Sequence, residues 1–104
     1  MLEQVFHMTQ NAEKVVEKII QDENLHLAHI VLPKGDVVPS HDTNATVYMT
    51  VVRGTLSIAL GDQEVATYEM GTVLKIPFET KMQVSNQHLA TLELMVVKAP
   101  APQL

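Results

Sequence analysis

The stretch "GDVVPSHDTNATVYMTVVRG", residues 35–54, decides the fold of this chain. A glycine stands at each end, where a turn can require positive φ, and Pro39 fixes φ near the start of a strand. In its second half Val47, Met49 and Val51 are spaced two residues apart. Because side chains two apart point to the same face of a strand, we expect these three to face the core.

The same alternation continues on both sides of this stretch, broken by Gly, Pro, Asn and Asp. It predicts further strands within residues 25–33, 55–60, 64–71, 72–77, 81–86 and 90–98. Many short strands at such intervals, without a strong helical pattern, indicate an all-β sandwich or barrel.

The segment 13–20 fits two interpretations. The spacing of its apolar residues, with Asn11 placed as an N-cap, suits a helix, whereas four β-branched residues, Val15, Val16, Ile19 and Ile20, suit a strand. We predict a strand.

The chain has 104 residues, enough for one core and therefore one domain. We expect an N-terminal segment at residues 1–11, a barrel domain at 12–98 and a Pro-rich tail at 99–104. Aromatics make up only 4% of the residues, with no Trp and six Met, so the core should be aliphatic.

Composition excludes several classes of protein. The absence of cysteine excludes disulfides and thiolate ligands, and the first residues lack the pattern of a signal peptide, so we expect a cytoplasmic protein. No apolar run reaches the length of a membrane span. A net charge of −5, with seven scattered Lys and Arg, argues against a nucleic-acid partner.

Residues 35–86 resemble the cupin family of small barrels. The first cupin motif runs glycine, histidine, histidine, glutamate, glycine, and these positions fall on Gly35, His41, Thr43, Val47 and Gly54. The resemblance implies a cupin double-stranded β-helix, or jelly-roll barrel, of the RmlC-like type.

The second cupin motif runs glycine, proline, glycine, histidine, asparagine. These positions fall on Gly71, Pro77, Glu79, Met82 and Asn86, so three framework positions match. The flanking strands extend the likeness to nearly the whole chain.

The positions that would hold a metal in this family depart from its pattern. The resemblance places the four ligands on His41, Thr43, Val47 and Met82. Only the imidazole is a competent ligand for the usual divalent metals, since Thr and Met are weak ligands and Val is none. We therefore predict a degenerate metal site and no cofactor; a metal on His41 is the less favoured alternative.

Instead, the same face of the barrel should form an apolar cavity. We assign ligand binding to His41, Thr43, Val47, Met49 and Met82, with His41 as the main polar group. Further inward residues complete the expected lining: Leu56, Ile58, Ile76, Val84 and Leu94. This arrangement describes either a filled core or a pocket for a small, mostly apolar ligand.

The other histidines have simpler expected roles. We expect His41 to hydrogen bond a hydroxyl or backbone group such as that of Thr43. His26 should point into the barrel and His29 to the opposite face, because they lie three apart on one strand. His7 and His88 fall in segments expected to be terminal or loop.

Two functions of different classes remain open. We favour a protein without catalytic residues that binds a small molecule, or only assembles, without a metal. The alternative is a metal-dependent enzyme of the dioxygenase or isomerase type, in which His26, Asp42 or a neighbouring subunit assists His41. An epimerase-like site with His41 as base lacks a visible partner acid.

We also expect a homodimer. Tyr48 and Val52 should face outward from the barrel, and Met95 extends this row. Cupins commonly dimerise by packing such sheet faces together.

Overall fold

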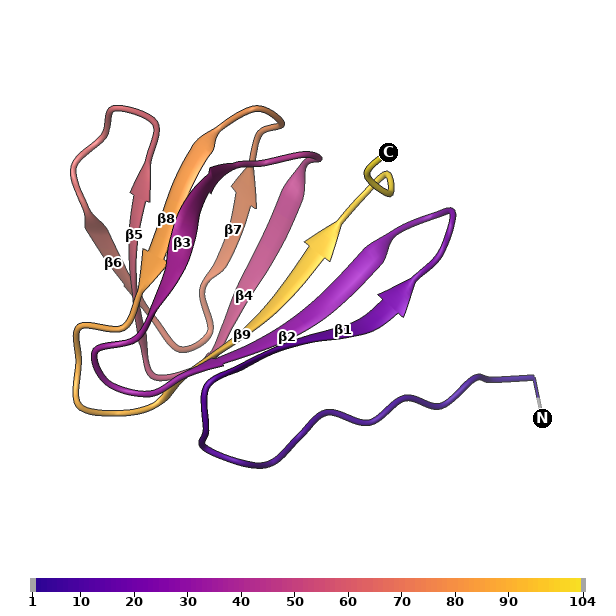
Figure 1. The fold of residues 1–104 in the computed structure, drawn as a ribbon, viewed down its shortest axis with the longest axis horizontal. Helices are drawn as coiled ribbons and strands as arrows, with labels where there is room; N and C mark the ends of the chain where they lie inside the picture. Colours follow the sequence, from indigo (N-terminus) through magenta and orange to yellow (C-terminus); the bar gives the residue numbers. More distant parts are fainter. Residues whose placement is uncertain (1, 104) are drawn as a thin grey trace.

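The computed structural model of the protein describes residues 2–103, which form nine β-strands (Figure 1). The strands are β1 (Val15–Gln21), β2 (His26–Leu32), β3 (Val37–Asp42), β4 (Val47–Arg53), β5 (Thr55–Leu60), β6 (Ala66–Glu69), β7 (Val73–Ile76), β8 (Lys81–Ser85) and β9 (Leu92–Lys98). The all-β prediction is confirmed, and so is the strand predicted within residues 13–20. Residues 2–103 contain no helix of the length and hydropathy that a membrane span needs.

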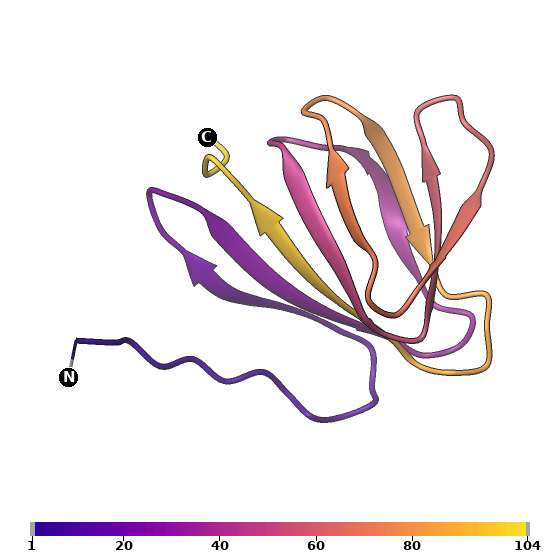
Figure 2. The ribbon, with the colours of Figure 1, turned by 180° about the vertical axis from the view of Figure 1, so that it is seen from behind.

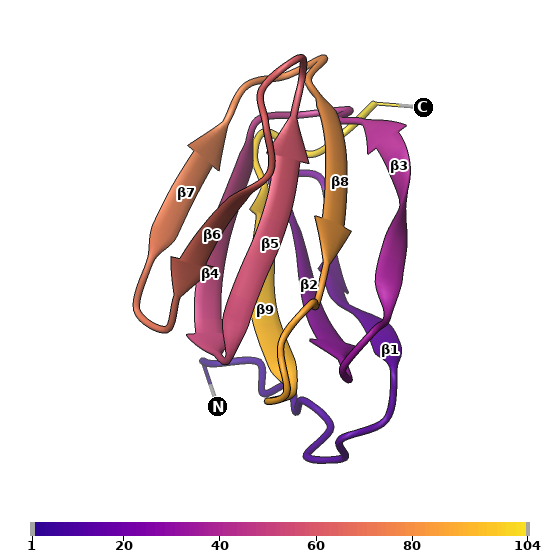
Figure 3. The same cartoon turned by 90° about the vertical axis from the view of Figure 1, so that its left-hand side faces the viewer.

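The strands form two antiparallel sheets that face each other (Figure 3). The larger sheet has the order β1-β2-β9-β4-β7, and the smaller has the order β3-β8-β5-β6. Strands distant in sequence thus become neighbours, since β9 lies between β2 and β4, and β8 lies between β3 and β5. The view from behind shows the same two layers (Figure 2).

The core fills the space between the sheets with aliphatic side chains. The alternation predicted in β4 is present, because Val47, Met49 and Val51 are buried while Tyr48 is exposed. Buried residues of this core are Ile30, Leu32, Val47, Met49, Val51, Leu56, Ile58, Ile76, Met82, Val84, Leu92, Leu94 and Val96. Leu56, Ile58, Ile76 and Leu94, predicted to face inward and to form either a filled core or a pocket, belong to this packed core.

A single residue, Gly54, joins β4 to β5. Its φ is 82°, and a Cβ there would lie 2.5 Å from the Thr91 carbonyl oxygen. Both the backbone conformation and the close approach therefore require glycine.

The N-terminal segment runs outside the larger sheet (Figure 1). The Thr9 backbone N–H donates to Glu17 Oε1 at 3.0 Å, and residues 6–10 lie beside Arg53 and Glu93. The C-terminal tail also contacts the barrel, since the Ala101 N–H donates to the Asn24 carbonyl at 3.1 Å.

Candidate functional site

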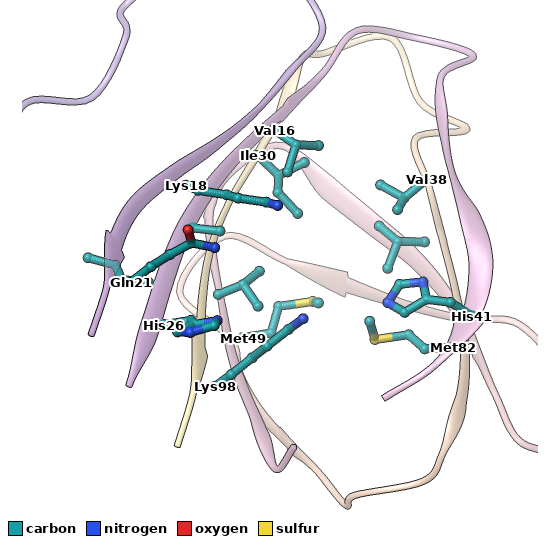
Figure 4. A pocket seen from close by; sticks show the side chains of 14 residues that line it. Val16, Lys18, Gln21, His26, Ile30, Val38, His41, Met49, Met82 and Lys98 are labelled. Atoms are coloured by element: carbon teal, nitrogen blue, oxygen red, sulfur yellow. The ribbon is translucent and has the colours of Figure 1, made fainter. Parts of the chain in front are cut away.

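A cavity of about 150 Å³ opens between the two sheets (Figure 4). Its floor is aliphatic, and polar side chains stand around it. The lining consists of Val16, Lys18, Gln21, His26, Leu27, Ala28, Ile30, Val38, His41, Met49, Met82, Val84, Val96 and Lys98.

On the larger sheet the lining is ordered in rows across neighbouring strands. One row places Gln21 of β1 beside His26 of β2, and His26 beside Lys98 of β9. The next row on the same face, two residues further along β2 and β9, comprises Lys18, Ala28, Val96 and Met49. Because cross-strand neighbours on one face lie close together, the polar groups form a rim above the aliphatic floor.

A β-bulge in β1 brings Gln21 to the cavity. The register of β1 against β2 shifts between Lys18 and Ile20. A bulge inserts one extra residue and so reverses which side chains point to a given face. Lys18 and Gln21 therefore both line the cavity, although they lie three positions apart and a regular strand would turn them to opposite faces.

A second irregularity, in β3, brings His41 to the cavity. The register against β8 shifts between Val38 and His41, so that both line the cavity. Their cross-strand neighbours on β8, Val84 and Met82, line it beside them. His41 Nδ1 donates to the Pro39 carbonyl oxygen at 3.0 Å. Since a carbonyl only accepts, Nδ1 is the protonated nitrogen and Nε2 remains for a ligand.

The structure divides the five predicted ligand-binding residues into two groups. His41, Met49 and Met82 line the cavity. Val47 is fully buried beside Lys98 and Thr43 is 2% exposed, and neither belongs to the lining.

Thr43 has a different partner from the one expected. Its hydroxyl donates to the Pro77 carbonyl at 2.7 Å and accepts from the Thr80 N–H at 2.9 Å. The expected hydrogen bond of His41 to a backbone group is confirmed, with Pro39 as the acceptor, but the suggested partner Thr43 is wrong. Thr43 ties the end of β3 to the turn before β8, because its hydroxyl faces that turn.

The cavity is more polar than expected. His41 was expected to be its main polar group, but Lys18, Gln21, His26 and Lys98 also line it. The inward direction predicted for His26 is confirmed. Lys98 could have been found by extending the alternation of β9, whereas Gln21 could not, because the bulge changes the parity.

Two of these polar groups, Lys18 and Lys98, carry like charges that act on each other. Burial lowers the pKa of Lys98, and the positive charge of Lys18 lowers this pKa further. Neither lysine makes an ion pair with a carboxylate within residues 2–103.

A second polar cluster lies on the opposite face of the larger sheet. The ring of His29 is 1% exposed, with Nδ1 2.8 Å from Glu17 Oε1 and Nε2 2.9 Å from Glu93 Oε1. Arg53 Nε lies 2.8 Å from Glu93 Oε2. The hydrogen bond to His29, and then that to the Thr9 N–H, lower the pKa of Glu17.

Sequence reasoning placed His29 on this face but missed its partners. Glu17 and Glu93 lie 12 and 64 residues from His29 in sequence, and only the pairing of β1 and β9 with β2 brings them together. Within residues 2–103, no three His, Asp or Glu side chains are grouped so that they could hold a metal ion.

Comparison with known proteins supports the fold and the family. An uncharacterized protein of Methanocaldococcus jannaschii is 38% identical over 104 residues, covering 99% of this chain and 90% of that protein. A crystal structure from the same organism, described as an RmlC-like cupin family protein with a double-stranded β-helix fold, matches with a TM-score of 0.95 and 38% identity. The match covers 98% of this chain and 94% of that chain. No protein-family model matches the sequence.

More distant structures share the fold alone. A double-stranded β-helix protein from Klebsiella pneumoniae has a TM-score of 0.79 at 16% identity, covering 90% of this chain and 83% of that one. A cupin-2 domain protein from Shewanella frigidimarina has a TM-score of 0.67 at 18% identity, covering 86% and 83%. The resemblance drawn from the two motifs is thus confirmed, and the chain belongs to the RmlC-like cupin family with its double-stranded β-helix fold.

Proposed function

We propose that this cupin binds a small organic molecule in the cavity between its sheets, without a metal and without catalysing a reaction. The observation that carries the proposal is the cavity itself, about 150 Å³ with an aliphatic floor and a polar rim. Small-molecule sites combine such apolar surface with a few placed polar groups that orient the ligand.

The side chains at the family's ligand positions support a metal-free, degenerate site. Thr43 directs its hydroxyl to Pro77 and Thr80, and Val47 has no donor atom. Met82 offers only a thioether, which the usual divalent metals bind weakly. His41 keeps Nε2 alone, and one imidazole nitrogen is not a set of three or four ligands.

A cavity-filling variant tests the binding site. Ala28 lies on the floor in the row with Lys18 and Val96, so Ala28→Leu would place three more carbon atoms in the cavity. We expect benzyl alcohol or benzoate to shift the amide NMR signals of lining residues saturably, and Ala28→Leu to abolish these shifts.

Ala59→Leu is the matched control. Ala59 lies on β5, outside the cavity lining, and the same substitution there should leave binding within about twofold, because no contact with the ligand changes. The proposal fails if neither probe shifts the lining residues, or if Ala28→Leu binds both as the parent protein does.

The absence of a functional metal is tested by elemental analysis. Purified protein should contain far less than one equivalent of iron, manganese, nickel or zinc. A stoichiometric metal that is lost in His41→Ala would contradict the proposal and favour the metal-dependent enzyme instead.

A further inference from the structure

The charges around the cavity are unlike those of the whole chain. Asp and Glu outnumber Lys and Arg by 12 to 7 in the sequence. The cavity lining, taken over residues 2–103, nevertheless contains two Lys and two His and no Asp or Glu. An acidic protein therefore has a cation-lined site.

Lys18 and Lys98 direct their ammonium groups into this cavity from β1 and β9 (Figure 4). Like charges repel, and partial burial of an ammonium group has a further cost because it loses water. Both effects act on Lys98, whose pKa they lower. An anion between the two lysines would remove the repulsion and replace the lost hydration.

Three more side chains that can form hydrogen bonds line the same cavity. Gln21 and His26 continue the row that contains Lys98, while His41 approaches from the smaller sheet with Nε2 uncommitted (Figure 4). The donors near Lys98 therefore lie on the larger sheet, and His41 adds an acceptor from the smaller sheet.

The floor beneath this rim selects against a bare inorganic anion. Ile30, Met49, Val84 and Val96 present hydrocarbon and offer no strong hydrogen-bond donor, so they match an apolar group. A cavity of roughly 150 Å³ accommodates a benzene ring in another protein. The cavity between these sheets has about the same volume.

We propose that the ligand is a small organic carboxylate, with its carboxylate held by Lys18 and Lys98 and its apolar body packed on the floor. This inference rests on the proposed binding function and names the chemical class of its ligand. Benzoate is a suitable probe, and benzyl alcohol has nearly the same shape without the charge.

Affinity of the two probes, measured by NMR titration of the full chain, tests the role of charge. We expect benzoate to bind at least about tenfold more tightly than benzyl alcohol, because hydrogen bonds to a charged group are roughly twice as strong as neutral ones. Equal affinities would overturn the carboxylate inference while leaving the binding function intact.

Single lysine variants test the residues. Lys18→Met and Lys98→Met retain an unbranched apolar side chain but remove the charge, and each should weaken benzoate binding about tenfold while changing benzyl alcohol binding less than about twofold. If the amide spectrum shows that Lys98→Met does not fold, Lys98→Arg replaces it. This variant keeps the charge and should keep benzoate binding, while Lys18→Met still tests the loss of a charge.

Lys75→Met is the matched control. Lys75 lies with Nζ 5.7 Å from the centre of the Tyr48 ring, outside the cavity lining, and its removal changes the net charge by the same amount. Benzoate affinity should stay within about twofold, since a solvent-exposed distant charge is screened by salt. An equal loss in Lys75→Met would mean that only the overall field matters, and would overturn the assignment.

Competition by inorganic phosphate shows whether binding needs the apolar body of the ligand or only its charge. We expect phosphate to compete with benzoate only weakly, because it makes no use of the floor. If phosphate binds with the same affinity as benzoate, and this binding depends on the two lysines, the proposal of an organic carboxylate is overturned. Absence of binding by every probe would overturn the binding function as well.

Discussion

Thr43 shows how one side chain can keep the fold while departing from the family's chemistry. It stands where the first cupin motif has its second histidine, yet its hydroxyl joins the Pro77 carbonyl to the Thr80 N–H. Its backbone also takes part, since the Thr43 N–H donates to the Thr80 carbonyl and the Thr43 carbonyl accepts from the Glu79 N–H. Glu79 has a φ of 61°, at the position where the second motif has glycine. Thr43 thus holds a strained turn in place.

Replacing Thr43 by valine should destabilise the protein by about 1–3 kcal/mol, because a buried acceptor and donor lose their partner while the shape is kept. Thr43→Ser retains the hydroxyl and should cost only about 0.8 kcal/mol for the buried methyl group. Urea unfolding would compare the two variants. A serine variant less stable than the valine variant would contradict the role given to the hydroxyl.

At the scale of elements, β1 connects three features of the molecule. Its bulge directs Lys18 and Gln21 into the cavity. On its other face Glu17 binds the ring of His29 on β2 and the Thr9 N–H of the N-terminal segment. Because β1 is an edge strand that pairs only with β2, these side-chain hydrogen bonds help to hold it on the sheet.

The Glu17 cluster predicts a change in acid stability. Because folding lowers the pKa of Glu17 below its ordinary value of 4.5, its carboxylate stabilises the folded state above pH 4.5, and this contribution is lost as pH falls through the lower folded pKa. Glu17→Gln should therefore be less stable than the parent protein near pH 7 and equally stable at strongly acidic pH.

Thermal unfolding measured across this pH range tests the expectation. Glu3→Gln serves as the control, since Glu3 lies in the exposed N-terminal segment and should leave the pH profile unchanged. A constant difference between Glu17→Gln and the parent protein at every pH would show that the charge of Glu17 is not responsible.

At the scale of the molecule, the outer face of the larger sheet carries exposed apolar side chains. Tyr48 is 37% exposed and Val52 is 40% exposed, on the face of β4 opposite the core. Met95 stands beside Thr50 on the neighbouring strand β9 and is half-buried. Such an apolar row is typical of a surface that another protein covers.

We propose that this row is the interface of a homodimer. Val52→Glu should weaken the dimer at least about tenfold, because an unpaired carboxylate would have to lose its water on association. Light scattering over a range of concentrations measures the change. Val65→Glu, at an exposed site that follows β5 of the other sheet, should leave the dimer intact. A parent protein that stays monomeric throughout would contradict the proposal.

The amino-acid sequence by itself determined the strands, the two cupin motifs and the inward faces of β4 and β9. These features are local, because alternation and turn residues act over a few neighbouring positions. The ambiguous segment at residues 13–20 is also a strand, since its β-branched residues outweigh its helical spacing.

Only the tertiary structure decided the composition of the cavity and the partners of its neighbours. An irregularity in β1 reverses the alternation, so Gln21 faces the cavity against the parity of its strand. The irregularity in β3 does the same for His41, whose place in the cavity only the first cupin motif predicted. The pairing of β2 with both β1 and β9 brings Lys18 and Lys98 to one site, although they lie near opposite ends of the chain. Register and long-range pairing are properties of the whole fold, and no short stretch of sequence contains them.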